Sequence, residues 1–140
     1  MRIIMIIITG SLLLQAQFYR NNNTNIVRDT KTFLQWQDNG TPFKKWNDAI
    51  DYCKDLSLGG YTDWRLPNIN ELFTLVDYTK FNPSMSNVFA YFDTGYYWSS
   101  TTSVHTNSRA WMIGFSSGEV KDYYDYKNDY NYVRCVRAGQ

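Results

Sequence analysis

The sequence predicts an α+β domain, with strands at both ends of the chain and two helices between them. The chain has 140 residues, which is the size of a single domain. Its 12 Tyr and 5 Trp residues favour strands over a helical bundle. Apolar residues recur at helical spacing in only two stretches, over 46–56 and 69–76. This order of elements indicates segregated α+β architecture rather than alternating α/β.

Residues 1–16 have the pattern of a secretory signal peptide. Arg2 provides a basic start, residues 3–14 are mostly apolar, and Ala16 is a small residue at a cleavage point. The alternative is an ordinary N-terminal strand or buried helix. The apolar run is too short to cross a bilayer comfortably. We therefore expect an exported protein with no integral membrane span after signal removal, a polar linker over 17–25, and a domain over 26–140.

Two strands are expected at the start of the domain, over 26–29 and 33–38, with a turn at 29–31. In the second strand Leu34 and Trp36 share one face, and Gln35 and Gln37 share the other.

The first helix is expected over 45–56, ending before Gly59 and Gly60. Its apolar stripe consists of Trp46, Ala49, Ile50, Cys53 and Leu56. The second helix begins after Pro67, with Asn68 as N-cap and Glu71 completing a capping box. The expected buried face of this helix is Ile69, Leu72, Phe73 and Val76.

The remainder of the chain reads as an irregular loop followed by strands. Residues 77–96 show no clear period. Strands are expected over 96–100, 110–115, 119–122 and 132–137, and Ser116-Ser117-Gly118 indicates a hairpin turn.

Charge and cysteine content narrow the class of protein. The formal net charge is +1 and the Lys and Arg residues form no basic stripe, so we expect no nucleic-acid partner. The two cysteines, Cys53 and Cys135, predict a disulfide if the protein is exported, and two separate buried thiols if it is not. A disulfide would close a loop of roughly 80 residues, worth about 4 kcal/mol by chain entropy.

The motif Asp63-Trp64-Arg65-Leu66-Pro67 places an acid, an aromatic and a base in a row. Arg65 could bind an anion, but a local carboxylate such as Asp63 or Glu71 is the more common partner for an arginine in this position. Trp64, like Trp98 and Trp111, is expected in the core rather than on a ligand platform. The motif therefore predicts a structural corner between the two helices.

The segment 122–132, here called the tyrosine-rich segment, is the best candidate for a binding site. Tyrosine provides large rigid contacts and asparagine adaptable hydrogen bonds, which is the composition of binding paratopes. The alternative is a solvated hairpin whose tyrosines pack on each other. The expected ligand-binding residues are Tyr123, Tyr124, Tyr126, Asn128 and Tyr130.

Catalytic, metal and cofactor sites are weakly supported. His105, the only histidine, lies in a polar stretch and indicates a solvated loop residue rather than part of a triad. Asp122, Asp125 and Asp129 could bind calcium, but acidic loops usually remain solvated. We expect no catalytic residues, no metal and no cofactor.

Several motifs together resemble the C-terminal domain of the Legionella collagen-like adhesin. They are Trp46–Cys53, Gly60–Pro67, Glu71-Leu72, Tyr97–Thr101, Ala110-Trp111 and Tyr132–Arg137. The family is similar in fold to the formylglycine-generating enzymes and C-type lectins. The resemblance implies a C-type-lectin-like fold with a twisted antiparallel sheet, adjacent terminal strands, long surface loops and a Cys53–Cys135 disulfide. It also implies sulfated-glycan binding and trimerisation, hence a homo-oligomer, but this sequence contains no collagen-like repeat and no clustered basic patch.

Two functions are expected from these observations. The first is an exported, non-catalytic binding or adhesion module that recognises a glycan or protein ligand at a cell surface. The alternatives are an enzyme or accessory protein derived from the formylglycine-generating branch, or a structural envelope domain. The enzyme would need a thiol or metal site, whereas Cys53 and Cys135 are better explained by structure.

Overall fold

The computed structural model describes residues 16–139, so the predicted signal peptide lies outside the described residues except for Ala16. Two helices and nine strands are present in this part of the chain, which confirms the α+β class. C-type-lectin-like similarity stays a prediction. No helix within residues 16–139 is long and apolar enough to span a bilayer.

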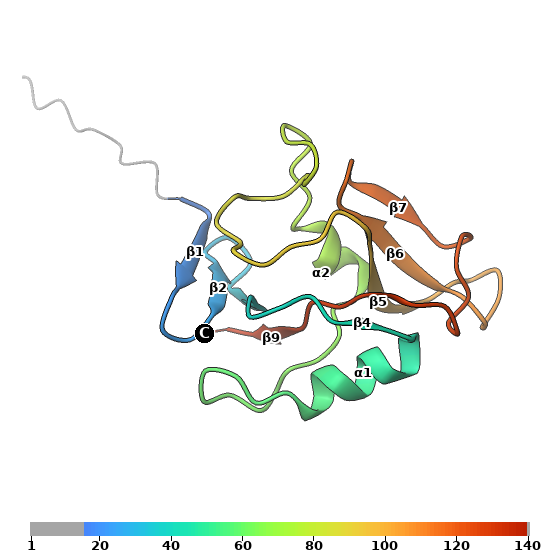
Figure 1. Ribbon diagram of the computed structural model, residues 1–140, viewed down its shortest axis with the longest axis horizontal. Helices are drawn as coiled ribbons and strands as arrows, with labels where there is room; N and C mark the ends of the chain where they lie inside the picture. Colours follow the sequence, from blue (N-terminus) through green and yellow to red (C-terminus); the bar gives the residue numbers. More distant parts are fainter. Residues whose placement is uncertain (1–15, 140) are drawn as a thin grey trace, which may run out of the picture.

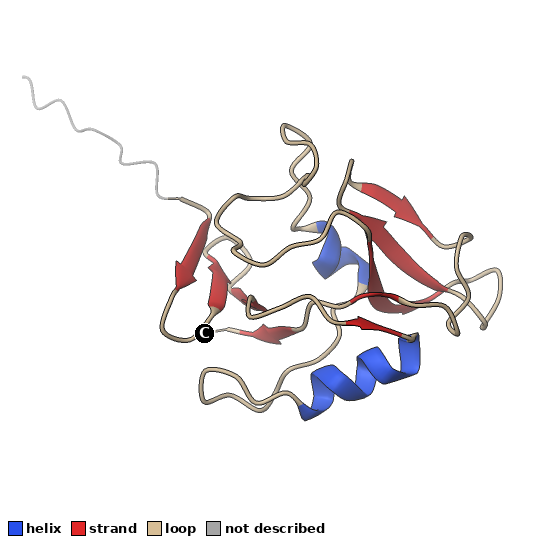
Figure 2. Ribbon diagram, viewed as in Figure 1, coloured by secondary structure: helices blue, strands red, loops and turns tan. Residues whose placement is uncertain are grey.

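The first and last strands of the chain form a four-stranded antiparallel sheet, here called the terminal sheet (Figures 1 and 2). Its strands, in spatial order, are β1 (Phe18–Asn21), β2 (Ile26–Asp29), β3 (Leu34–Gln37) and β9 (Val136–Ala138). The predicted linker over 17–25 is wrong in its first half, because β1 pairs along its whole length with β2. The terminal strands share this sheet but are not direct neighbours, since β9 pairs with β3.

The remaining strands form a second, five-stranded sheet, here called the central sheet. Its strands, in spatial order, are β4 (Phe43–Lys44), β8 (Asn131–Tyr132), β5 (Tyr96–Thr102), β6 (Ala110–Gly114) and β7 (Glu119–Lys121). The strands thus form two sheets that are mainly antiparallel, and the central one is mixed because β5 pairs with β8 in parallel. The hairpin turn predicted at 116–118 does join β6 to β7, with Gly118 at a φ of 80°.

The strand predicted over 132–137 is divided between the two sheets. β8 ends at Tyr132 and β9 begins at Val136. Between them the Cys135 amide donates to the side chain of Gln37 (3.1 Å), and the Val133 amide donates to the Pro42 carbonyl (2.9 Å). These bonds replace a strand ladder, and the chain crosses from the central to the terminal sheet at this point.

Helix α1 (Trp46–Asp55) follows the predicted stripe, with Ala49 and Cys53 fully buried. Gly59 and Gly60, at φ of 63° and 81°, form a turn beyond the helix end rather than its cap. A Cβ at Gly59 would lie 2.4 Å from the Ile26 side chain, so this turn packs directly on the terminal sheet.

Helix α2 (Ile69–Phe73) is shorter than its apolar pattern predicted. Phe73 is 44% exposed, so its assignment to the buried face is wrong, and Val76 lies beyond the helix end. Leu72 is buried as predicted, and Leu75 is buried as well, because the chain leaves the helical path after Phe73. The helix packs against β5 and β6.

Residues 77–95 form the predicted irregular loop, which folds back over the sheets (Figure 1). The loop is tied to the β6–β7 hairpin by amides of Asn82 and Ser84, which donate to Ser116 and Phe115 (2.9 and 2.8 Å). Its Met85 and Phe89 side chains are buried in the core. This anchoring explains how a segment without periodicity is still ordered.

Candidate binding surface

The tyrosine-rich segment runs from β7 to β8 across one end of the central sheet (Figure 1). Its backbone is tied to two neighbouring elements. The Lys127 amide donates to the Ser108 carbonyl (2.8 Å), and the Lys127 carbonyl accepts from the Trp46 amide at the start of α1 (3.0 Å). A tight turn follows, in which the Tyr126 amide donates to the Asp129 carboxylate (2.7 Å). The segment is therefore anchored at Tyr126 and Lys127 although it has no regular structure before β8.

Tyr123 and Tyr124 lie near a lysine on β7. The Lys121 ammonium lies 4.5 Å from the ring centre of Tyr124 and 6.0 Å from that of Tyr123. Tyr124 also stacks on Tyr96 of β5, with ring centres 6.3 Å apart. Both Tyr123 and Tyr124 keep 60% or more of their surface exposed.

The same lysine belongs to a small polar cluster. Lys121 pairs with Glu119 at 3.0 Å, and the Tyr96 hydroxyl donates to that carboxylate at 2.8 Å. Hydrogen bonding with Tyr96, and then with Glu119, raises the pKa of Lys121 above its usual range. The ammonium therefore stays charged at neutral pH, and its contact with the tyrosine rings persists.

Tyr126 is placed by an arginine from a different loop. The Arg109 guanidinium lies 4.6 Å from the Tyr126 ring centre, and one of its N–H groups donates to the Tyr126 hydroxyl at 3.0 Å. Tyr126 remains 51% exposed, and Asn128 is exposed in the turn that follows. The isolated bridge between Arg109 and Tyr126 places the tyrosine-rich segment beside residues 103–109.

Tyr130 lies at the β4 edge of the central sheet. Its ring stacks on Phe43 at 5.8 Å, and the Lys45 ammonium lies 5.6 Å from its centre. Phe43 in turn packs on Tyr132 at 4.9 Å. Phe43 and Tyr130 are 55% and 52% exposed, so this pair presents a continuous aromatic surface.

Each exposed tyrosine of the segment therefore has a cation near its ring, supplied by Lys121, Arg109 or Lys45. The tyrosines lie in three separate places, one near each of these cations. Among the described residues they do not stack on each other. The sequence did not indicate the partners Phe43, Tyr96 and Arg109, because all of them are distant in the chain. These partners could be identified only in the folded structure, where a cation from one element lies near an aromatic ring from another.

The acidic residues of the segment each have a local hydrogen-bonding partner. Asp122 accepts from the Ser103 hydroxyl (2.8 Å), and Asp125 accepts from the Asn131 amide group (3.0 Å). Asp129 closes the turn at Tyr126. Within residues 16–139, no three His, Cys, Asp or Glu side chains converge on a metal-sized site. His105 is 78% exposed and lies 3.8 Å from Asp122.

The Asp63–Pro67 motif forms the predicted corner. Arg65 binds Glu71 through two N–H groups, at 2.6 and 2.7 Å, and Trp64 is buried. Asp63 is taken by Arg137 of β9 instead (2.7 Å), and this hydrogen bond lowers the pKa of Asp63. The motif thus joins the turn before α2 to the last strand. The Arg65 guanidinium is already bonded to Glu71, so it is not free to bind another anion.

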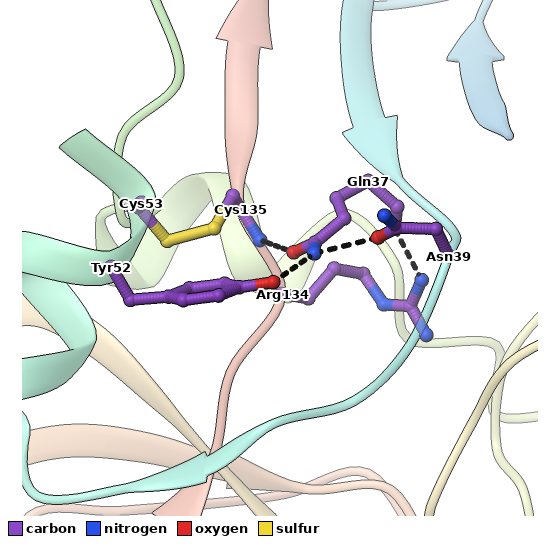
Figure 3. Close-up of a disulfide and its surroundings, with 6 residues drawn as sticks. All are labelled: Gln37, Asn39, Tyr52, Cys53, Arg134 and Cys135. Atoms are coloured by element: carbon purple, nitrogen blue, oxygen red, sulfur yellow. Dashed lines mark hydrogen bonds between the residues drawn. A yellow bond between two sulfur atoms is a disulfide. The ribbon is translucent and has the colours of Figure 1, made fainter. Parts of the chain in front are cut away.

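The disulfide between Cys53 and Cys135 is present, with Cα atoms 5.4 Å apart (Figure 3). Gln37 lies beside it and is fully buried. Its side-chain amide donates to Asn39 and to the Tyr52 hydroxyl, both at 2.8 Å, while its side-chain oxygen accepts from the Cys135 amide. Sequence patterning had assigned Gln37 only to the face opposite Trp36, yet it joins α1, β3 and the disulfide.

The family model of the Lcl C-terminal domain matches residues 25–137 of this chain. The chain belongs to the Lcl C-terminal domain family. A comparison with curated proteins finds no match. The Lcl match includes the whole tyrosine-rich segment, both cysteines and the Asp63–Pro67 motif, while β1 lies outside the matched range. Membership in this family is compatible with adhesion.

Proposed function

We propose that this Lcl-family domain is an exported, non-catalytic adhesion module that binds a glycan through the tyrosine-rich segment. The observation that carries the proposal is the combination of exposed rings with a fixed backbone. Tyr123, Tyr124, Tyr126 and Tyr130 are all at least half exposed, whereas the backbone beneath them is tied to α1 and to residues 103–109. Rings that are already ordered lose little conformational entropy when a ligand docks.

The chemistry of these rings suits a sugar surface. A tyrosine ring offers an apolar face for the C–H groups of a pyranose, and its hydroxyl supplies a donor and an acceptor. Asn128 and the exposed edge of the turn add adaptable hydrogen bonds. A protein ligand would use the same groups, so it is the second outcome of the test below.

The state of the two cysteines favours binding over catalysis. Cys53 and Cys135 are fully buried and joined to each other, so neither supplies a thiolate. No other cysteine occurs in the chain. A formylglycine-generating type of reaction would need a reactive thiol that this pair does not provide.

The test is binding of the exported protein to a glycan array and to immobilised cell-surface protein, repeated at increasing salt. Stacking on tyrosine does not depend on ion pairing, so binding to a neutral glycan should change less than about twofold between 0.1 and 0.5 M salt. A steep loss with salt would indicate polyanion binding by lysine and arginine instead. Binding to neither surface would contradict the proposal.

A further inference from the structure

Strand β1 forms the outer edge of the terminal sheet, as Figure 1 shows. Natural edge strands are usually protected by lysine, proline, bulges or a covering element. Residues 18–21 contain no lysine or proline, and pair with β2 without a bulge. Their one charge, on Arg20, is turned toward the buried carboxylate of Asp38 at 2.5 Å. Apart from its length of four residues, the strand therefore shows none of these protective features within residues 16–139.

The hydrogen-bond register leaves backbone groups of β1 directed outward. The Thr30 amide donates to the Gln17 carbonyl at 2.8 Å, and the Asn25 amide donates to the Asn21 carbonyl at 2.9 Å. In an antiparallel ladder the residues bonded to the partner strand recur at every second position. The backbone groups of Phe18 and Arg20 consequently face away from β2, where a further strand would pair.

A pocket lies on each face of this edge. The inner one, of about 520 Å³, is lined by Phe18, Val76 and Val88 among others. The outer one, of about 670 Å³, is lined by Tyr19, Arg28 and Phe33 together with Ala16 and Thr30. Side chains of an added strand alternate between the two faces, so successive residues would enter the two pockets in turn.

Arg28 defines the charge of the outer pocket. Its guanidinium lies 5.9 Å from the Phe33 ring centre and has no carboxylate partner among residues 16–139. The other arginines near this sheet are different, since Arg20 pairs with Asp38 and Arg137 pairs with Asp63. A second copy of this chain paired through β1 would add another Arg28 and no acid, so charge complementarity favours a different partner.

We propose that β1 binds an extended peptide segment of a partner protein as a fifth strand of the terminal sheet. The segment carries a glutamate or aspartate side chain on the outer face, where it pairs with Arg28, and aliphatic side chains on the inner face. Backbone hydrogen bonds to Phe18 and Arg20 provide affinity, and the Arg28 pocket provides specificity. This site is separate from the tyrosine-rich segment and does not depend on it.

The test uses the exported protein and a blocked heptapeptide that alternates valine with threonine and has glutamate at the centre. Amide NMR shifts on titration should begin at Phe18 and Arg20 and spread to the residues of β2. Replacing the central glutamate with glutamine should weaken binding about tenfold, because a charge-assisted hydrogen bond is lost. A peptide with N-methyl groups on the alternate residues whose amides face β1 should not bind, because it cannot pair with the edge.

The variant Arg28→Gln should bind the glutamate and glutamine peptides equally, at the weaker affinity. Lys31→Gln is the matched control, because Lys31 is exposed nearby and its loss changes the net charge equally. It should keep the tenfold preference. The proposal is overturned if the Phe18 and Arg20 amides do not respond, if the N-methylated peptide binds as well, or if Arg28→Gln keeps the preference for glutamate.

Discussion

At the scale of single residues, the most consequential feature is a buried group of charges around Asp38. Its carboxylate is fully buried, and it accepts from Arg20, from Arg134 (3.3 Å), and from the amides of Ala90 and Tyr91. Arg134 also donates to the Gln37 and Tyr91 carbonyls. One carboxylate thus holds together β1, β3, the long loop and the crossing between the two sheets.

Replacing Arg134 with methionine should lower the free energy of unfolding by about 3–5 kcal/mol. The change removes one of the two arginines that pair with the buried Asp38 carboxylate and takes a donor from the Gln37 and Tyr91 carbonyls, and breaking a buried ion pair is costly. Urea unfolding followed by tryptophan fluorescence measures the effect.

Arg65→Met is the matched control for this variant. Arg65 also pairs with a carboxylate, but its side chain is 47% exposed, so its loss should cost about 1 kcal/mol or less. Equal effects of the two variants would show that burial of the Asp38 group contributes nothing particular to stability.

At the scale of elements, the short helix α2 depends on its first turn. Asn68 accepts from the Glu71 amide at 2.8 Å, and the Glu71 carboxylate accepts from the Asn68 amide at 3.0 Å. Arg65 also forms an ion pair with the Glu71 carboxylate. Burial raises the pKa of Glu71, but the hydrogen bonds from Arg65 and Asn68 and the charge of Arg65 together hold it below the ordinary value of 4.5.

This shift predicts a pH dependence of stability. Between the lowered folded pKa and 4.5 the unfolded chain binds more protons than the folded chain, so stability rises with pH in that window. Glu71→Gln should therefore be less stable than the wild type by about 0.5–1 kcal/mol at pH 7. The difference should vanish as the pH falls through the folded pKa. Urea unfolding at a series of pH values measures it, and a pH-independent difference would contradict the assignment to the ionised carboxylate.

The capping box could be predicted because its two residues lie three positions apart, and local chemistry alone relates them. The partner of Asp63 could not be predicted in this way. It is Arg137, 74 residues further along the chain, and the backbone bridge between Arg65 and Val136 of β9 brings them together. Strand β1 was missed for a similar reason, because its polar residues read as a linker until β2 pairs with them.

At the scale of the whole molecule, the disulfide ties α1 to the segment in which the chain returns from the central to the terminal sheet. Cys53 of α1 and Cys135 are 82 residues apart in the chain, and the segment after Tyr132 passes from the central to the terminal sheet. The disulfide could be predicted because two cysteines allow one intramolecular pairing. The division of the last strand could not, because Gln37 intercepts the Cys135 amide from a strand nearly 100 residues earlier.

The composition of the tyrosine-rich segment predicted its exposure but not the arrangement of its side chains. The composition of the tyrosine-rich segment indicated exposed tyrosines, and they are exposed. Their separation into three positions follows from long-range partners, such as Phe43 for Tyr130 and Arg109 for Tyr126. Anchoring of each ring from outside the segment makes the surface preorganised.

The most direct test of the central claim compares the affinity of the wild type and two tyrosine variants for a glycan identified on the array, by isothermal titration calorimetry. Tyr130→Ala removes a 52% exposed ring of the segment, and Tyr78→Ala removes a 67% exposed ring of the long loop as a matched control. An account in which the tyrosine-rich segment binds the ligand predicts a loss of about tenfold or more for Tyr130→Ala and less than about twofold for Tyr78→Ala, with unchanged folding of both. Equal affinity of Tyr130→Ala and the wild type would contradict it.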